Sequence, residues 1–290
     1  MAEYDRAEED LGNVVILEHV NTRVPDQRPA TLFYIAGLGL TRDPYMMTSV
    51  TNMWANVGRS QFHLPTGAAQ VVRGRTGIVV PDREALIKRL EAVAPMLKET
   101  KFAFEATKSC VETVCPWGNR IRCYTPGAGF GRMQLGIAYV ELDVPRGTAE
   151  GIARFYRKML ATPATIAKEA GVTRAKVVVG ADQFMIFREG DTVGPAYDGH
   201  HVAIYIADFS GPHRRLKDQG LVTQESDQHQ YRFDQLIDPD TGAKLFQIEH
   251  EVRSLRHPFY ARPLVNRDPR RTNMSFARGY EDLSWSTPPR

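Results

Sequence analysis

The segments HVNTRVPD (19–26) and HVAIYIAD (201–208) share one pattern, in which apolar residues lead from a histidine to an aspartate. RTGIVVPD (75–82) and YVELDVPR (139–146) have the same pattern, with Arg and Tyr in place of the histidine. The four starts lie 56, 64 and 62 residues apart, which is the length of one small supersecondary unit. The chain is therefore predicted to consist of four copies of one module.

Helix-like and strand-like stretches follow these segments in a regular order. Apolar residues recur three and four apart over 83–98 and 148–161, which predicts helices. Each repeat then ends in an alternating or β-branched stretch: SQFHLP (60–65), GNRIRCYTP (118–126), DQFMIF (182–187) and KLFQIEHEV (244–252). The order of strand, helix and several strands predicts an α+β fold of four βαβββ modules.

Composition excludes several classes of protein. The chain has 290 residues, 42% hydrophobic and 24% charged, which is typical of a globular protein. Its net charge of +3 is scattered apart from a cluster between Arg253 and Arg271, so we expect no nucleic-acid partner. Three cysteines without a CxxC pair favour a reducing, cytoplasmic location over a disulfide framework or a cysteine zinc site. An acidic N-terminus and the lack of a long apolar run predict neither a signal peptide nor a membrane partner.

The glycine-rich stretch PGAGFGR (126–132) is the predicted domain boundary. It separates modules one and two (1–130) from modules three and four (131–252). The arginine- and proline-containing tail (253–290) is predicted to be an extended strap over the protein or a subunit contact, which allows a homodimer.

The succession of HV-x-x-x-V-P-D, a helix, and late phrases such as QFHLP (61–65) and DPDTGAKLFQIEHE (238–251) resembles the vicinal oxygen chelate superfamily. That superfamily includes glyoxalase I, methylmalonyl-CoA epimerase and the extradiol ring-cleaving dioxygenases. The resemblance covers residues 14–252. It implies that modules pair into two cup-shaped, barrel-like mixed sheets, and that a divalent metal is held by the first and last strands of two modules.

Carried over to this chain, the resemblance defines two sets of ligand positions. They are His19, Arg75, Tyr139 and His201 in the first strands, and Gln61, Arg122, Gln183 and Glu249 in the last strands. A guanidinium is a permanent cation that cannot donate a lone pair, so module two supplies no ligand. Arg75 and Arg122 are then either an anion pocket in place of a metal site or ordinary ion-pair residues.

The pairing of the modules decides the metal site. If module one pairs with module four, the ligands are His19, Gln61, His201 and Glu249, the set of the epimerase branch. If one pairs with two and three with four, only His201 and Glu249 remain, with Gln183 or Tyr139. The first set suits Fe²⁺, Mn²⁺, Co²⁺, Ni²⁺ or Zn²⁺ and leaves positions for two adjacent oxygens of a small-molecule substrate.

The carboxylate ligand is the position at which this chain departs from the family phrase. That phrase places the acid about four residues beyond the glycine of DP-x-G, where this chain has Phe246. Gln247, Glu249 and Glu251 share one strand face by alternation. Glu249, the central acid, is the predicted ligand, and Glu251 is the alternative.

Three residues are predicted to take part in catalysis. His63 shares the strand face of Gln61 and is a candidate acid or base. Tyr205 shares the face of His201, where it either lines the pocket or packs in the core. Glu249 completes the predicted catalytic set.

Three functions are compatible with these residues. A metal-dependent lyase or isomerase of the glyoxalase and epimerase type is the leading expectation. An Fe(II) extradiol dioxygenase would use His19, His201 and Glu249, although QYRFDQLIDPDTG (230–242) has Phe233 where the family phrase has a tyrosine. A non-catalytic protein that binds a small molecule in the cup is the third.

Overall fold

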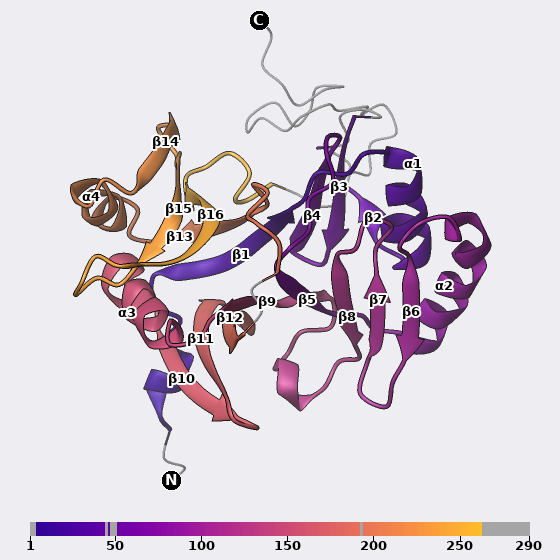
Figure 1. The fold of residues 1–290 in the computed structure, drawn as a ribbon, viewed down its shortest axis with the longest axis horizontal. Coiled ribbons are helices and arrows are strands. Elements are labelled where there is room, and N and C mark those ends of the chain that lie inside the picture. The colour runs from indigo at the N-terminus through magenta and orange to yellow at the C-terminus, as the bar shows by residue number, and fades with distance from the viewer. Residues whose placement is uncertain (1–3, 44–45, 47–50, 192–193, 263–290) are drawn as a thin grey trace, which may run out of the picture.

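The structure is a computed structural model that describes residues 4–43, 46, 51–191 and 194–262. After a short 3-10 turn, Arg6–Glu9, the chain forms four successive βαβββ modules (Figure 1). The predicted α+β module order is confirmed.

Each module contributes four strands and one helical segment. Module one contains β1 (Val14–Asn21), α1 (Gln27–Ala30) with a π-helical continuation (Thr31–Gly37), β2 (Thr41–Arg42), β3 (Asn52–Val57) and β4 (Ser60–Pro65). Module two contains β5 (Gly74–Val79), α2 (Arg83–Leu97), β6 (Ala103–Ala106), β7 (Val111–Val114) and β8 (Arg120–Tyr124). Module three, after a 3-10 turn (Ala128–Phe130), contains β9 (Gly136–Pro145), α3 (Ala149–Leu160), β10 (Ala164–Glu169), β11 (Val172–Gly180) and β12 (Gln183–Gly190). Module four contains β13 (His201–Ile206), α4 (Ser210–Asp218), β14 (Val222–Asp227), β15 (Gln230–Ile237) and β16 (Lys244–Ser254).

The modules pair as one with four and two with three. The first sheet has the order β14-β15-β16-β13-β1-β4-β3-β2, and the second has the order β10-β11-β12-β9-β5-β8-β7-β6. In each sheet the two first strands, β1 with β13 and β5 with β9, pair antiparallel at the centre. Of the two pairings that the sequence leaves open, the structure therefore has the one that joins the first and last modules.

Both sheets draw strands from both of the segments 1–130 and 131–252. The predicted boundary near residue 130 falls in the connection from β8 to β9, which joins two modules of one sheet. The predicted tail, 253–290, begins inside β16, because this strand runs to Ser254. Residues 255–262 follow the strand as irregular chain. Residues 263–290 of the predicted strap lie outside the described residues.

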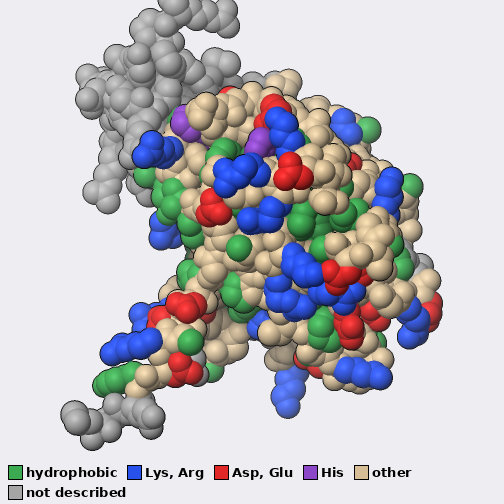
Figure 2. Space-filling model, turned by 90° about the vertical axis from the view of Figure 1, so that its left-hand side faces the viewer, with side chains coloured by type: hydrophobic (Ala, Val, Ile, Leu, Met, Phe, Trp, Pro, Cys, Tyr) green, Lys and Arg blue, Asp and Glu red, His purple; other side chains and the backbone are tan. Residues whose placement is uncertain are grey.

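The helices cover the sheets through apolar stripes, as α3 illustrates. Its buried residues recur at helical spacing and include Ile152, Phe155, Tyr156 and Met159. The helix ends at Ala161, whose left-handed conformation (φ 54°) stops further helical hydrogen bonding. On the other side of α3, Arg154 and Lys158 pair with acids of the β15–β16 connection. The face shown in Figure 2 accordingly carries interspersed basic and acidic side chains.

Gln183 joins the two sheets. Its amide accepts from Leu17 N at 3.0 Å and donates to the carbonyls of Leu17 and Ile137 and to Ser60 Oγ. This residue is the last-strand ligand position of module three, yet all its polar atoms bind β1, β4 and β9. These hydrogen bonds hold β1, the strand that carries His19, against the second sheet.

Candidate metal centre

The site is built on four neighbouring strands, β4, β1, β13 and β16, whose registers place residues in two rows. One row is Gln61, His19, Ala203 and Glu251, and the other is His63, Asn21, His201 and Glu249. Ala203 is the only small side chain among these positions, so the flanking side chains have room to converge above it.

A β-bulge in β1 turns an additional carboxylate into the site. Leu17 pairs with Ile204 and His19 pairs with Ala203, so Glu18 is an extra residue without a partner of its own in the strand register. Bulges re-aim side chains in this way, often beside active sites. Glu18 and His19, although consecutive, meet side by side, with Glu18 Oε2 at 2.6 Å from His19 Nδ1.

His19, His201 and Glu251 form a compact group of potential ligands. One donor atom of each lies within 4.8 Å of the others, and all three residues are buried. The two imidazole centroids are 5.6 Å apart. Residues from the first and the last modules are thus brought within reach of a single ion.

Neighbouring carboxylates orient both imidazoles. Glu18 accepts the Nδ1–H of His19, which leaves the Nε2 lone pair free, and Nε2 has no hydrogen-bond partner among the described residues. His201 has Glu249 Oε1 at 3.3 Å from Nδ1 and Glu251 Oε2 at 3.6 Å from Nε2. Burial, together with nearby cationic groups, holds the pKa of His201 well below its usual value, so its ring is neutral.

Glu251, not Glu249, completes this group. Glu249 lies directly across from His201 and contacts the Nδ1 side of its ring, whereas Glu251 lies across from Ala203 and reaches between the two imidazoles. Arg232 pairs with both carboxylates, but the side chain of Glu249 is 25% exposed, while that of Glu251 is only 4% exposed. Glu249 therefore occupies the position of an orienting residue for His201.

Gln61 is engaged elsewhere. Its amide nitrogen donates to Asp43 Oδ2 at 2.7 Å and to Asn56 Oδ1, and its carbonyl oxygen accepts from Arg262. The oxygen predicted to bind a metal is therefore held by a guanidinium from the C-terminal segment. Arg262 is buried and also contacts Glu18 and Asp43.

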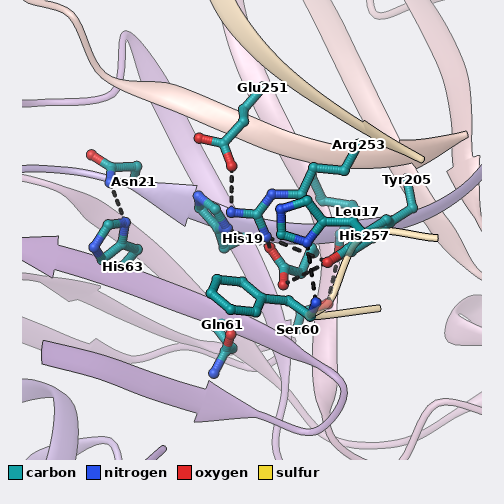
Figure 3. Close-up of polar contacts among 12 residues, drawn as sticks. Leu17, His19, Asn21, Ser60, Gln61, His63, Tyr205, Glu251, Arg253 and His257 are labelled. Atoms are coloured by element: carbon teal, nitrogen blue, oxygen red, sulfur yellow. Dashed lines mark hydrogen bonds and ion pairs between the residues drawn. The ribbon is translucent and has the colours of Figure 1, made fainter. Parts of the chain in front are cut away.

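His63 lies beside these ligands, and one of its ring nitrogens is a free donor. Asn21 Nδ2 donates to its Nδ1 at 2.6 Å, which leaves the proton on Nε2, an atom without a partner among the described residues (Figure 3). The ring stacks on Trp54 at 3.8 Å and is 5.5 Å from His19 between centroids. Burial and the neighbouring His19 and Arg253 hold its pKa well below the usual value, so the ring is neutral.

Arg253 connects the two halves of the site. Its Nη1 lies 2.6 Å from Glu18 Oε2. Its Nη2 contacts Glu251 Oε1 (Figure 3). Burial opposes ionisation of Glu18, but Arg253, His19 and Arg262 together hold its pKa well below the usual value. Tyr205 donates to Glu18 at 3.3 Å, so its hydroxyl supports this carboxylate and does not point to the ligand atoms.

Sequence patterns do not predict the roles of Glu18, Arg253, Arg262 and Asp43. Strict alternation would turn Glu18 away from the face of His19, and only the bulge reverses this. Arg253 and Arg262 belong to the tail that was predicted to be a strap or a subunit contact, and both are buried. The clearest signal in the sequence is the acid directly before His19.

The donor set fits a divalent metal. Two imidazoles and one carboxylate match the two-His, one-carboxylate face of non-haem iron sites. Each imidazole has a carboxylate at its other nitrogen, the arrangement that orients histidine ligands in metalloproteins. Unpartnered buried Nε2 atoms are costly without a ligand, which is a second reason to place an ion there.

Comparison with known proteins gives matches at the level of structure only. No family model matches the chain, and no curated protein matches it. A Bacillus subtilis protein described as a "putative dioxygenase" is similar with a TM-score of 0.54 and 15% identity, over 84% of this chain and 86% of that one. Glyoxalase I from Zea mays is similar with a TM-score of 0.55 and 16% identity, over 82% and 92%. The cppA protein from Streptococcus pneumoniae has a TM-score of 0.50 and 10% identity, over 84% and 99%.

Identities this low establish the fold alone. The paired βαβββ modules, the two cup-like sheets and these matches agree with the resemblance seen in the sequence. The chain therefore has the fold of the vicinal oxygen chelate superfamily.

Proposed function

We propose that the chain is a metal-dependent enzyme in which His19, His201 and Glu251 hold a divalent ion, and that it is an Fe(II) oxygenase of the extradiol type. The observation that carries the proposal is the convergence of two imidazoles and one carboxylate, with the carbonyl of Gln61 held by Arg262. Three protein ligands leave several positions of an octahedral ion open, as oxygenases require.

The chain's own residues would share the work as follows. When bound, iron supplies Lewis-acid and redox chemistry toward a substrate with adjacent oxygens and dioxygen. Glu18 and Glu249 keep the two imidazoles oriented with Nε2 toward the ion. His63 offers its Nε2–H as a hydrogen-bond donor to a substrate oxygen that becomes anionic, in a site where burial strengthens the interaction.

One observation keeps a second candidate, a lyase or isomerase of the glyoxalase and epimerase type. Gln61 is the direct register neighbour of His19, so its carbonyl becomes available as a fourth ligand if Arg262 withdraws. An ion held by these three ligands and Gln61 would stabilise an enolate in a reaction that needs no dioxygen. The residues of the first three ligands are common to both candidates.

The first experiment measures bound metal by elemental analysis. We expect about one ion per chain in the wild type, and loss of that ion in His19→Ala, His201→Ala and Glu251→Gln. His213→Ala is the matched control, since this histidine pairs with Glu225 on the outside of the protein. Full metal retention in both His19→Ala and His201→Ala would remove this site from consideration.

The second experiment separates the two reactions. Protein reconstituted anaerobically with Fe²⁺ is mixed with a panel of catechols in aerated buffer, and oxygen uptake is recorded. We expect uptake with at least one catechol and its loss in His201→Ala. No uptake across the panel, combined with turnover of a 2-oxoaldehyde hemithioacetal, would transfer the assignment to the lyase candidate.

A further inference from the structure

The second sheet repeats the geometry of the metal centre with different side chains. Its four central strands, β8, β5, β9 and β12, place Arg122, Gly77, Tyr139 and Phe184 in one row. The first sheet has His63, Asn21, His201 and Glu249 in that row. The position equivalent to His19 is Arg75, because Arg75 pairs with Glu141 as His19 pairs with Ala203.

Tyr139 fills the centre of this second cup. Its ring lies directly over Gly77, where a Cβ atom would overlap the ring. Its hydroxyl is 2.9 Å from that of Tyr124. The ring of Tyr139 occupies the space that a metal between β5 and β9 would need. Arg75 and Arg122, which stand at the positions of His19 and His63, cannot donate a lone pair to a metal.

An open cavity of about 300 Å³ is lined by residues of β5, β6, β7 and β8. Its cationic lining consists of Arg75, Arg120 and Arg122, and its acidic lining consists of Glu105 and Glu112. Ala103 and Val114 supply apolar surface. The lining therefore has three positive and two negative groups, a net charge of one positive unit.

The arginines are grouped closely on one face of the sheet. Arg75 and Arg120 each directly precede the register pair Thr76 and Ile121, so they lie side by side on neighbouring strands. Arg122, two residues beyond Arg120, is on the same face. Each of the three already has a carboxylate partner, Glu141, Asp143 and Glu112 in turn, and a bound anion would add to these.

The existing partners leave donors free for such an anion. Arg120 is half-exposed, and its contact with Asp143 is long, at 3.4 Å. Arg122 directs both Nε and Nη2 to one oxygen of Glu112, at 3.0 and 2.9 Å, and that carboxylate is itself 47% exposed. Exposed ion pairs contribute little to stability, so a ligand can replace those of Arg120 and Arg122 at small cost. The pair of Arg75 with Glu141, at 2.9 Å, is only 16% and 10% exposed and would stay in place.

We propose that this cavity binds the oxyanion group of a small molecule, a carboxylate or a phosphate, through Arg75, Arg120 and Arg122. Planar guanidiniums that lie in a group recognise such groups by two parallel hydrogen bonds. Glu105 and Glu112, direct neighbours across β6 and β7, repel the anion from that end and orient it toward Arg75 and Arg120. The inference rests on the second sheet alone and is independent of the proposed metal chemistry.

The test is calorimetric titration of the full chain with inorganic phosphate and, separately, with malonate, each against KCl at matched ionic strength. We expect saturable binding of at least one of the two probes, weakened about tenfold or more in Arg120→Gln and in Arg122→Gln. Arg146→Gln is the control, because this exposed arginine pairs with Asp191 outside the cavity. It should bind like the wild type.

Two outcomes would overturn the proposal. One is the lack of saturable heat beyond that of KCl for both probes. The other is binding of equal strength in the wild type and in all three variants. Circular dichroism of each variant establishes that it is folded, and repeating the titration after removal of metal with a chelator separates this cavity from the metal centre, since binding here should not change.

Discussion

Replacing Glu18 by glutamine removes a buried negative charge while keeping the shape of the side chain. Glu18 is 4% exposed and has His19 Nδ1 and Arg253 Nη1 both at 2.6 Å, with Arg262 at 3.3 Å. Breaking a buried ion pair by removing one partner costs about 3–5 kcal/mol when the other is left alone. Because each guanidinium keeps a second carboxylate, we expect a loss of about 2–3 kcal/mol in the free energy of unfolding.

The same substitution should weaken metal binding. The neutral amide of the Glu18→Gln variant would no longer be an obligatory acceptor, so the proton of His19 would be free to move to Nε2, the nitrogen that faces the other ligands. Removing such an orienting partner lowers metal affinity roughly 10–100-fold. Titration of the metal-free protein with Co²⁺, followed by absorbance, measures this change.

The effect on stability should depend on pH. The pKa of Glu18 is lowered in the folded chain, so its contribution is complete above its usual value of 4.5 and is lost as the pH falls below that value toward the folded pKa. The difference between wild type and Glu18→Gln should therefore be largest at neutral pH and shrink in acid. Urea denaturation of the metal-free protein at neutral and at acidic pH measures it.

Glu225→Gln is the matched control for this experiment. Glu225 also has a histidine partner, His213 at 2.9 Å, but its side chain is 54% exposed. An exposed pair contributes up to about 1 kcal/mol. If Glu18→Gln is no more destabilising than Glu225→Gln at neutral pH, and binds Co²⁺ as tightly as the wild type, the orienting role of Glu18 is refuted.

Three further substitutions test the framework of the fold by urea denaturation. Gln183→Met should lower the free energy of unfolding by about 2–4 kcal/mol, because buried backbone groups of both sheets lose their hydrogen-bond partners. A change under about 1 kcal/mol would contradict the role of Gln183 in joining the two sheets. Tyr156→Phe should cost about 1–3 kcal/mol, because His250 Nε2 loses its partner at 2.6 Å, whereas an unchanged unfolding midpoint would show that this bond is dispensable. Gly58→Ala should lower the free energy of unfolding by more than about 1 kcal/mol, since Gly58 has φ 64° and a Cβ there would overlap the carbonyl of Leu135. Wild-type stability in this variant would show that the turn adjusts without cost.

The module architecture was predictable because it is a local and repeated property of the chain. The strand at 201–206, the helix at 83–97 and the last strand at 60–65 all occur where apolar spacing and turn residues indicated them. The sequence left the pairing of the modules open, although only the pairing of module one with module four unites His19 with His201. The structure joins module one to module four.

Side-chain positions within the site depended on features that single-strand periodicity does not contain. The choice of Glu251 over Glu249 follows from the parallel register of β13 and β16, which places Glu251 beside the small Ala203. The engagement of Gln61 follows from Arg262, a residue far along the chain that returns to the first module.

The sequence by itself determined the number, order and type of the elements, because alternation and helical spacing are encoded within a few residues of each position. Only the tertiary structure decided which polar atoms meet. A one-residue bulge turned Glu18 toward His19, and strand register and the return of the C-terminal segment selected the partners of Glu251 and Gln61. The contacts of Glu18 with Arg253 and of Gln61 with Arg262 join residues 235 and 201 positions apart, and their energies depend on burial in the folded chain.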